Sequence, residues 1–203
     1  MSTPTRRRTP SAGMEAGLLD AASELLEREG PDALSIRRIA AAAGVAPMGV
    51  YNHFASKSGI IEALFIQGFV RLGGAMKTLA ALSDPREALL EGGRRYRALA
   101  LAHPMAYQLM FLRAVPGFEP SDHAKEVAAE AFEGLVAAVA RAMGAGVIAG
   151  ESAPVLAQII WASIHGFVAL ELGGIGFIDD HDAGAALLCA TVLDGLRPGA
   201  EAG

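Results

Sequence analysis

The chain of 203 residues contains a single cysteine, Cys189, and few aromatic side chains, which make up 6% of the sequence. One cysteine cannot form a disulfide within the chain, so a disulfide-stabilised scaffold is excluded and a reducing compartment is expected. No uninterrupted apolar run reaches the roughly 18–20 residues that a membrane-spanning helix requires. No apolar segment of signal-peptide length follows the basic start of the chain. We therefore expect a cytoplasmic protein with no membrane partner.

Positive charge is also in short supply, with 17 Lys and Arg against 22 Asp and Glu and a formal net charge of -5. A uniform distribution of that charge would argue against binding to nucleic acid, whose phosphates attract cations. The distribution is uneven. Residues 33–61 contain three basic and no acidic side chains, whereas residues 61–203 contain 10 basic and 16 acidic ones. The short acid-free segment therefore suits a surface that faces phosphate.

Hydrophobic residues are abundant, at 52% of the chain, which excludes intrinsic disorder and allows a sizeable core. Apolar side chains recur with the helical period, as at Leu18, Ala22, Leu25 and Leu26. No segment alternates with the period of a strand. The sequence predicts an all-α fold with helices at 11–29, 35–43, 47–54, from 57 onward, 85–102, 104–112, 121–142, 152–172 and 181–196.

The first three helices follow the helix-turn-helix pattern, with a tight turn at Gly44-Val45 between the second and third. In this motif the second helix crosses the DNA backbone, and the third enters the major groove with its N-terminal residues first. Ser35 is a good N-cap for the second helix, and Pro47 suits the first turn of the third. Together with the charge of residues 33–61, this pattern predicts a DNA-binding domain.

Four short runs carry a specific resemblance: LSIRRIA at 34–40, AGV at 43–45, VYNHF at 50–54 and SK at 56–57. In combination, over about residues 12–65, they resemble the TetR family of transcriptional regulators. The resemblance implies a three-helix DNA-binding domain followed by a larger helical domain that dimerises and usually binds a small-molecule inducer. The predicted parts are a flexible basic arm at 1–10, the helix-turn-helix domain at 11–57 and a regulatory and dimerisation domain at 58–203.

The resemblance also implies roles for single residues. Tyr51 matches a position that contacts a backbone phosphate, and Lys57 matches the phosphate-binding lysine of the family. Gly49 offers no side chain at a central groove position, so we expect Arg37 and Met48 to carry more of the base reading. The predicted DNA-binding set is Ser35, Arg37, Pro47, Met48, Gly49, Tyr51, Asn52, His53 and Lys57.

A second, shorter pattern is Trp161, His165 and Gly166, which resembles the C-terminal domain of one branch of these regulators, named for its Trp-His-Gly residues. Trp161 and His165 share a helix face. They either line an inducer pocket or pack the core, and the sequence leaves both readings open. Met and aromatic side chains give adaptable apolar walls to a pocket. The predicted ligand-binding set is Trp161, His165, Tyr96, Tyr107, Met110 and Phe111.

The last two predicted helices are rich in small residues, which allow two helices to pack closely. We expect them to form a homodimer across a two-fold axis, with a tighter core inside one subunit as the competing explanation. The residues concerned are Ala157, Ala162, Gly166, Ala169, Ala183, Ala186, Ala190 and Leu193.

The chain contains no Gly-rich phosphate loop, Gly-x-Ser-x-Gly or His-Glu-x-x-His sequence, which are motifs of catalysis. Its histidines and single cysteine lack the spacing of metal ligands. We therefore expect no enzyme, cofactor or metal. The leading hypothesis is a sequence-specific repressor that a small-molecule ligand releases from palindromic operator DNA. Two alternatives stay open: a helical ligand-binding or enzymatic protein that has lost specific DNA reading, and an activator of the same fold.

Overall fold

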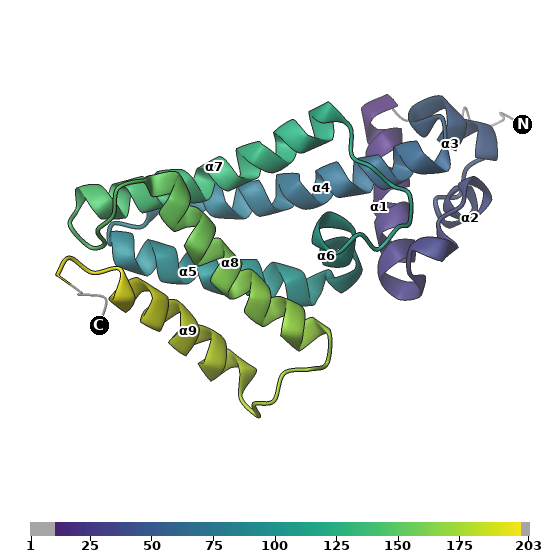
Figure 1. The fold of residues 1–203 in the computed structure, drawn as a ribbon. Helices are drawn as coiled ribbons and strands as arrows, with labels where there is room; N and C mark the ends of the chain where they lie inside the picture. The colour runs from purple at the N-terminus through teal and green to yellow at the C-terminus, as the bar shows by residue number, and fades with distance from the viewer. Residues whose placement is uncertain (1–10, 200–203) are drawn as a thin grey trace, which may run out of the picture. The chain divides into compact units, whose positions relative to one another are not determined.

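The computed structural model describes residues 11–199, and every regular element in that range is a helix (Figure 1). The predicted all-α fold is confirmed. The described residues divide into two compact units: a first unit of residues 11–66 with 105–121, and a second unit of residues 67–104 with 122–199. The predicted basic arm at 1–10 lies outside the described residues. The domain boundary after residue 57 stays a prediction, since the first unit includes the start of the next helix and a later segment of the chain.

The helices begin and end close to the predicted positions. The first unit contains α1 (Ser11–Glu29), the one-turn 3-10 helix η1 (Pro31–Ala33), α2 (Ile36–Ala42), α3 (Pro47–Phe54), the start of α4 (Lys57–Lys77) and α6 (Pro104–Phe111). The second unit contains the rest of α4, the 3-10 helix η2 (Thr78–Ala81), α5 (Pro85–Ala102), α7 (Asp122–Gly144), α8 (Ala153–Leu172) and α9 (His181–Gly195). Periodicity does not predict η1 and η2, because three or four residues are too few for a period to show.

Polar caps explain where the helices around the turn start. Ser35 has extended backbone, and its hydroxyl oxygen accepts a hydrogen bond from the Arg38 N–H at 3.3 Å. Ser56 accepts one from the Gly59 N–H at 3.1 Å at the start of α4. Gly44 has a φ of 67°, a left-handed conformation that glycine adopts without steric cost. These local features produce the tight α2–α3 turn that the sequence predicts.

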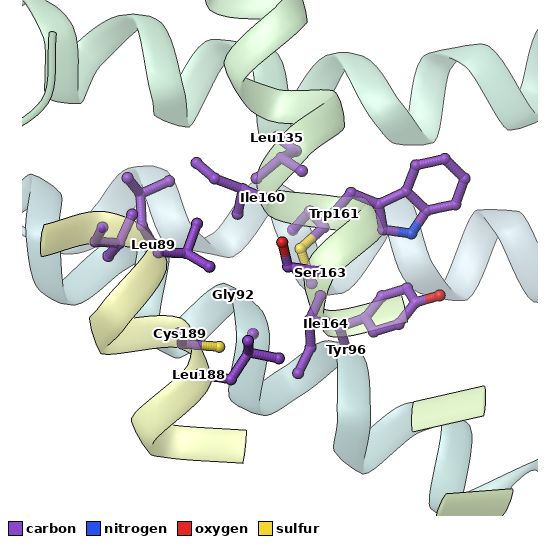
Figure 2. Close-up of a pocket in the computed structure, with 14 residues that line it drawn as sticks. Leu89, Gly92, Tyr96, Leu135, Ile160, Trp161, Ser163, Ile164, Leu188 and Cys189 are labelled. Atoms are coloured by element: carbon purple, nitrogen blue, oxygen red, sulfur yellow. The ribbon is translucent and has the colours of Figure 1, made fainter. Parts of the chain in front are cut away.

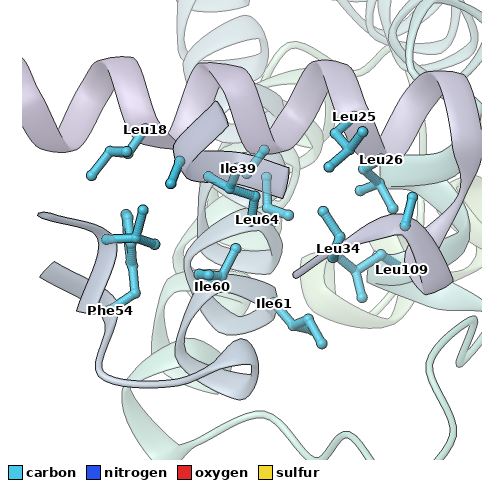
Figure 3. Close-up of a cluster of buried hydrophobic side chains, with 14 residues drawn as sticks. Leu18, Leu25, Leu26, Leu34, Ile39, Phe54, Ile60, Ile61, Leu64 and Leu109 are labelled. Carbon is cyan, nitrogen blue, oxygen red and sulfur yellow. The ribbon is translucent and has the colours of Figure 1, made fainter. Parts of the chain in front are cut away.

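The core of the first unit is built mainly from leucine and isoleucine side chains of α1, α2 and α4 (Figure 3). Val50 and Phe54 join it from α3, and they bury one face of that short helix. Each large apolar side chain that is fully buried contributes about 1.5–3 kcal/mol relative to exposure. The fully buried members of this core include Leu18, Leu26, Leu34, Ile39, Val50 and Ile60.

A carboxylate joins α6 to α1 within the first unit. The two side-chain oxygens of Glu27 accept hydrogen bonds from the N–H groups of Met105 and Ala106, each at 3.0 Å. The first N–H groups of a helix have no partner inside the helix, and its N-terminal end is the positive end of the helix dipole. Glu27 therefore gives the first N–H groups of α6 an acceptor and places a negative charge at the positive end of the helix dipole.

The second unit is a bundle in which α5, α7, α8 and α9 contribute to a shared core. The C-terminal part of α4 packs closely on α7: a Cβ placed on Gly73 would lie 3.4 Å from the Ala131 backbone, and one on Gly134 would lie 3.4 Å from the Met76 side chain. The core residues of this unit include Leu89, Val139, Ile148, Leu156 and Leu193.

Two helical stretches, Lys57–Ala81 and Ala153–Leu172, have the length and apolar composition that would let a helix cross a membrane. Half of the first is buried within the described structure, as in a core helix of a globular protein. The most apolar part of α8 differs, because only 22% of it is buried. Val155, Ile159 and Leu170 on this helix are exposed. An exposed apolar surface of this kind marks an interaction site.

Gly59→Ala is expected to lower the free energy of unfolding of the first unit by about 1–3 kcal/mol, the usual cost of overpacking. A Cβ on Gly59 would lie 2.1 Å from the Phe54 carbonyl oxygen, so the backbone between α3 and α4 must shift. Urea denaturation measures the change. Gly17→Ala is the matched control, because no other part of the described structure lies within 4 Å of its added Cβ, and alanine in a helix is up to about 1 kcal/mol more stable than glycine. Equal stability of Gly59→Ala and the wild type would contradict the role of this contact.

Candidate DNA-binding surface and ligand cavity

The outward face of α3 is a compact exposed surface in the first unit. Val50 and Phe54 turn into the core, which leaves Pro47, Met48 and Tyr51 exposed on the other side. Met48 is 67% exposed and Tyr51 is 50% exposed. Asn52 is also exposed. The structure therefore brings together the predicted groove-facing residues of the third helix on one accessible face.

Two cations near this face have no ionic partner among residues 11–199. Arg37 on α2 and Lys57 at the start of α4 are exposed and form no salt bridge there. Arg38 differs, because its guanidinium donates to the Glu29 carboxylate at 2.6 Å and lowers the pKa of Glu29. Arg37 and Lys57 thus keep their charge available for phosphate or for guanine, while Arg38 links α2 to α1.

Three of the predicted DNA-binding residues, His53, Ser35 and Gly49, also make contacts inside the first unit. His53 is half-buried, with Nδ1 lying 3.8 Å from a Glu15 carboxylate oxygen. The Ser35 hydroxyl is the cap of α2. Gly49 is half-buried, and a Cβ there would make ordinary contact with Val45 at 3.7 Å. These contacts orient α2 and α3, and the outward face of α3 is not covered by any part of residues 11–199.

The second unit contains an apolar cavity between α5, α8 and α9 (Figure 2). Its volume is about 40 Å³, enough for a few water molecules. Figure 2 shows the rings of Tyr96 and Trp161 on the same side of it. A larger groove of about 520 Å³ adjoins the cavity and shares Gly93, Ile164 and Cys189 with it. The groove alone falls in the usual size range of ligand sites.

Tyr96 and His165 are joined next to the cavity. The Tyr96 hydroxyl and His165 Nδ1 lie 2.8 Å apart, in hydrogen-bonding contact. Burial lowers the pKa of His165, since it disfavours the charged imidazolium. The His165 ring also lies 5.5 Å, centroid to centroid, from the Trp161 ring. The Trp-His pair predicted from the sequence therefore belongs to an aromatic cluster at the edge of the cavity.

The other three predicted ligand residues lie in the first unit. Tyr107, Met110 and Phe111 are on α6, where the Tyr107 and Phe111 rings are 5.1 Å apart, and they are not among the residues that line this cavity. Two lining positions outside the predicted ligand-binding set are Gly93 and Cys189. A Cβ on Gly93 would lie 2.6 Å from the Cys189 sulfur, so a larger residue at 93 would force the Cys189 side chain or α9 to move. In the sequence, the adjacent glycines at 92–93 inside a helix are the feature that could have indicated this close contact between α5 and α9.

The small residues of the last two helices divide into two groups. Ala157 and Leu193 are buried inside the second unit, so their predicted place in a subunit interface is wrong: they face the core of their own chain. Ala162 and Gly166 on α8, and Ala186 on α9, are exposed. The outer faces of the two helices are therefore still available to a partner.

Comparison with known proteins agrees with this architecture. Residues 18–64 match the family described as bacterial regulatory proteins, tetR family, and residues 89–193 match the tetracyclin repressor-like C-terminal domain. An uncharacterised HTH-type transcriptional regulator of Mycobacterium tuberculosis is 28% identical over 176 residues, which cover 87% of this chain and 77% of that protein.

Solved structures show the same fold. A Rhodococcus sp. RHA1 protein of unknown function aligns with a TM-score of 0.82 at 27% identity, over 97% of this chain and 100% of that one. The fatty acid degradation regulator FadR of Bacillus halodurans aligns with a TM-score of 0.73 at 19% identity, over 90% and 99% of the two chains. At 19% identity, the similarity to FadR is a similarity of fold alone.

The helix-turn-helix, its exposed α3 face and the larger helical unit define a DNA-binding transcriptional regulator with two functional parts. With family matches over both parts, the chain belongs to the TetR family of transcriptional regulators.

Lys57→Ala is expected to weaken binding to every DNA sequence alike and to reduce the salt dependence of the affinity by about one phosphate per subunit, because it removes one unpaired cation. Fluorescence anisotropy over a salt series measures both effects. Arg37→Ala is the matched comparison, since it removes an equal charge but is expected to relax base preference as well. An unchanged salt slope in Lys57→Ala would exclude a phosphate contact at this residue.

The stability of the second unit is expected to fall as pH drops below about 6.5, the usual pKa of histidine. His165 has a lowered pKa in the folded state, so below that pH the unfolded chain binds the proton more readily than the folded one. The stabilisation is therefore complete above this pH and is lost on acidification. Urea denaturation from pH 5 to 8 measures it. His165→Gln should flatten this dependence, and identical pH profiles for variant and wild type would contradict the assignment.

Proposed function

We propose that this chain is a cytoplasmic repressor that binds a palindromic operator as a homodimer and is released by a small molecule bound in its second unit. The observation that carries the proposal is the outward face of α3. It is exposed, residues 33–61 contain no acidic side chain, and Arg37 and Lys57, which flank α3 in the sequence, form no salt bridge among residues 11–199. In this arrangement the first residues of α3 enter the major groove.

The contacts to DNA divide into two kinds. Tyr51, His53 and Lys57 would hold the phosphate backbone and supply sequence-independent affinity. Arg37 would donate to guanine, and Met48 would contact a thymine methyl group. The absence of a side chain at Gly49 keeps the number of direct base contacts small. Specificity then depends on a few contacts that are repeated in two half-sites.

The dimer would use the outer faces of α8 and α9. Val155, Ile159 and Leu170 are exposed on α8, and Leu187 on α9 is 68% exposed. The exposed Ala162 lies among them and permits close approach of a partner helix. Apolar surface of this extent is stabilised by burial against a second copy. Two-fold symmetry of that dimer would place the two α3 helices on successive turns of the DNA, about 34–36 Å apart.

The inducer would be a small, largely apolar molecule that enters through the groove between α5 and α9. The inner cavity of about 40 Å³ is too small for such a molecule, so binding requires that α5 and α9 separate near Gly93 and Cys189. A ligand that binds only the opened state shifts the population toward it. The hydroxyls in the cavity lining are those of Tyr96, which is bonded to His165 Nδ1, and Ser163, which donates to the Ile159 carbonyl oxygen at 2.9 Å, so a polar group of the ligand would join or replace these bonds.

The order of the helices along the chain connects this proposed movement of α5 to the DNA-binding part. Along the chain, α5 ends at Ala102 and α6 begins at Pro104, with only His103 between them. The first N–H groups of α6 are held by Glu27 of α1. A shift of α5 on ligand binding would therefore act directly on a helix that is attached to α1.

The proposal is tested with the full-length protein and labelled DNA from just upstream of its own gene. We expect specific, salt-sensitive binding by two subunits per site, competed by unlabelled fragment and not by a shuffled sequence of equal composition. A panel of small apolar compounds is then screened for thermal stabilisation of the protein and for loss of operator binding. Absence of salt-sensitive binding to any such fragment would overturn the DNA-binding role. Stabilisation without release from the operator would overturn the induction mechanism.

A further inference from the structure

The loop between α8 and α9 presents an unusually exposed aromatic side chain. The loop spans residues 173–180 and joins α8 to α9 (Figure 1). Phe177, near the middle of this segment, is 97% exposed. Ile175 and Ile178 beside it are 53% and 46% exposed. A phenylalanine left in water forgoes the stabilisation of its burial, so three large apolar side chains exposed on one loop indicate a site of interaction.

This loop is held in place on both sides of Phe177. The Ile175 N–H donates to the Leu170 carbonyl oxygen at 3.1 Å, with Gly174 in the left-handed conformation at a φ of 68°. After Phe177, the Asp180 carboxylate accepts a hydrogen bond from the Ala183 N–H at 2.9 Å and caps α9. Phe177 is therefore displayed by an ordered loop, and its exposure does not result from an unstructured segment.

Side-chain packing restricts the loop further. The Ile178 side chain reaches α9, where a Cβ on Gly184 would lie 2.4 Å from its terminal carbon. The ring of His181 lies equally close to Gly176, at 2.5 Å from the position of an added Cβ. A larger residue at either glycine would force the Ile178 or the His181 side chain to move. The loop is fixed close to the first turn of α9.

An ion-pair network fixes the two helix ends on which the loop rests. Arg97 of α5 donates to both carboxylate oxygens of Glu171 at 2.7 Å, and it also pairs with Asp182. Arg97 and Glu171 are each only 14% exposed, and the guanidinium lowers the pKa of Glu171. A forked arginine contact of this kind is geometrically specific. It joins the end of α8 and the start of α9 to α5.

We infer that Phe177 is an anchor that packs against a second copy of this chain and extends the subunit interface beyond the helices. The inference rests on the dimer of the proposed function, because the loop continues the exposed apolar faces of α8 and α9. Leu170 lies in the last turn before the loop, and Leu187 lies on the helix that follows it. Because hydrogen bonds on both sides of Phe177 hold the loop backbone before association, little backbone entropy is lost on binding, and a large aromatic side chain presented in this way is a typical hot spot.

Charge around the loop favours a second copy over other occupants. Asp179, Asp180 and Asp182 follow Phe177 within five residues. Three carboxylates disfavour contact with DNA phosphates and with an anionic membrane surface.

Phe177→Ala is expected to raise the dimer dissociation constant of the full-length protein by at least about tenfold, because each subunit loses one anchor. Sedimentation equilibrium over a dilution series measures the constant. Val70→Ala is the matched control, since Val70 is 59% exposed on α4, away from this loop in the sequence, and should leave it unchanged. Phe177→Leu should retain most of the affinity. Circular dichroism checks that each variant keeps its helical content.

The outcomes separate this inference from the proposed dimer. If Leu187→Arg abolishes dimerisation while Phe177→Ala keeps the dimer dissociation constant of the wild type, the α8–α9 dimer stands and the role of Phe177 as an anchor is overturned. A wild type that stays monomeric at micromolar concentration overturns both. A photoreactive benzoylphenylalanine in place of Phe177 gives a direct readout: crosslinks between subunits support the anchor, and crosslinks confined to one chain contradict it.

Discussion

The burial of Val50 and Phe54 is the interaction on which the DNA-binding part depends. Helix α3 has only eight residues, too few to be stable alone, so its existence depends on packing against the core of the first unit. The same two side chains fix its rotation. With one face held inside, Met48, Tyr51 and Asn52 must face outward, and Gly44 and Gly59 supply the turns that allow this position. A hydrophobic constraint thus determines where the polar recognition surface lies.

The second unit uses apolar and charged contacts for different purposes. Its inner cavity is apolar and nearly closed, and Gly93 lets the Cys189 side chain approach α5 at the boundary with the open groove. Arg97 of α5 holds the end of α8 through Glu171 and the start of α9 through Asp182, and Arg86 pairs with Asp194 near the end of α9. In the proposed induction mechanism, the middle of α9 would separate from α5 near Gly93 while both of its ends stay attached. A ligand would then alter the helices of the proposed dimer without unfolding them.

Much of this could be predicted from local sequence signals. Serine caps, Gly-Pro breaks and apolar periodicity place every described α-helix within a few residues, and the acid-free segment identifies the face of α3. Contacts between distant residues could not be predicted. Nothing local shows that Arg38 pairs with Glu29, that Tyr107 and Phe111 belong to the first unit, or that Ala157 and Leu193 face their own core. The same limit applies to Gly93 and Cys189, which lie 96 positions apart in the chain.

The most direct measurement is a methylation-interference footprint on the operator with the full-length protein. Methylation at guanine N7 blocks the major groove without changing the phosphate backbone. If the outward face of α3 reads DNA in a two-fold dimer, interfering guanines will form two symmetric clusters about one helical turn apart. Binding that tolerates methylation throughout the protected region, or interference confined to one unrepeated cluster, would contradict the account.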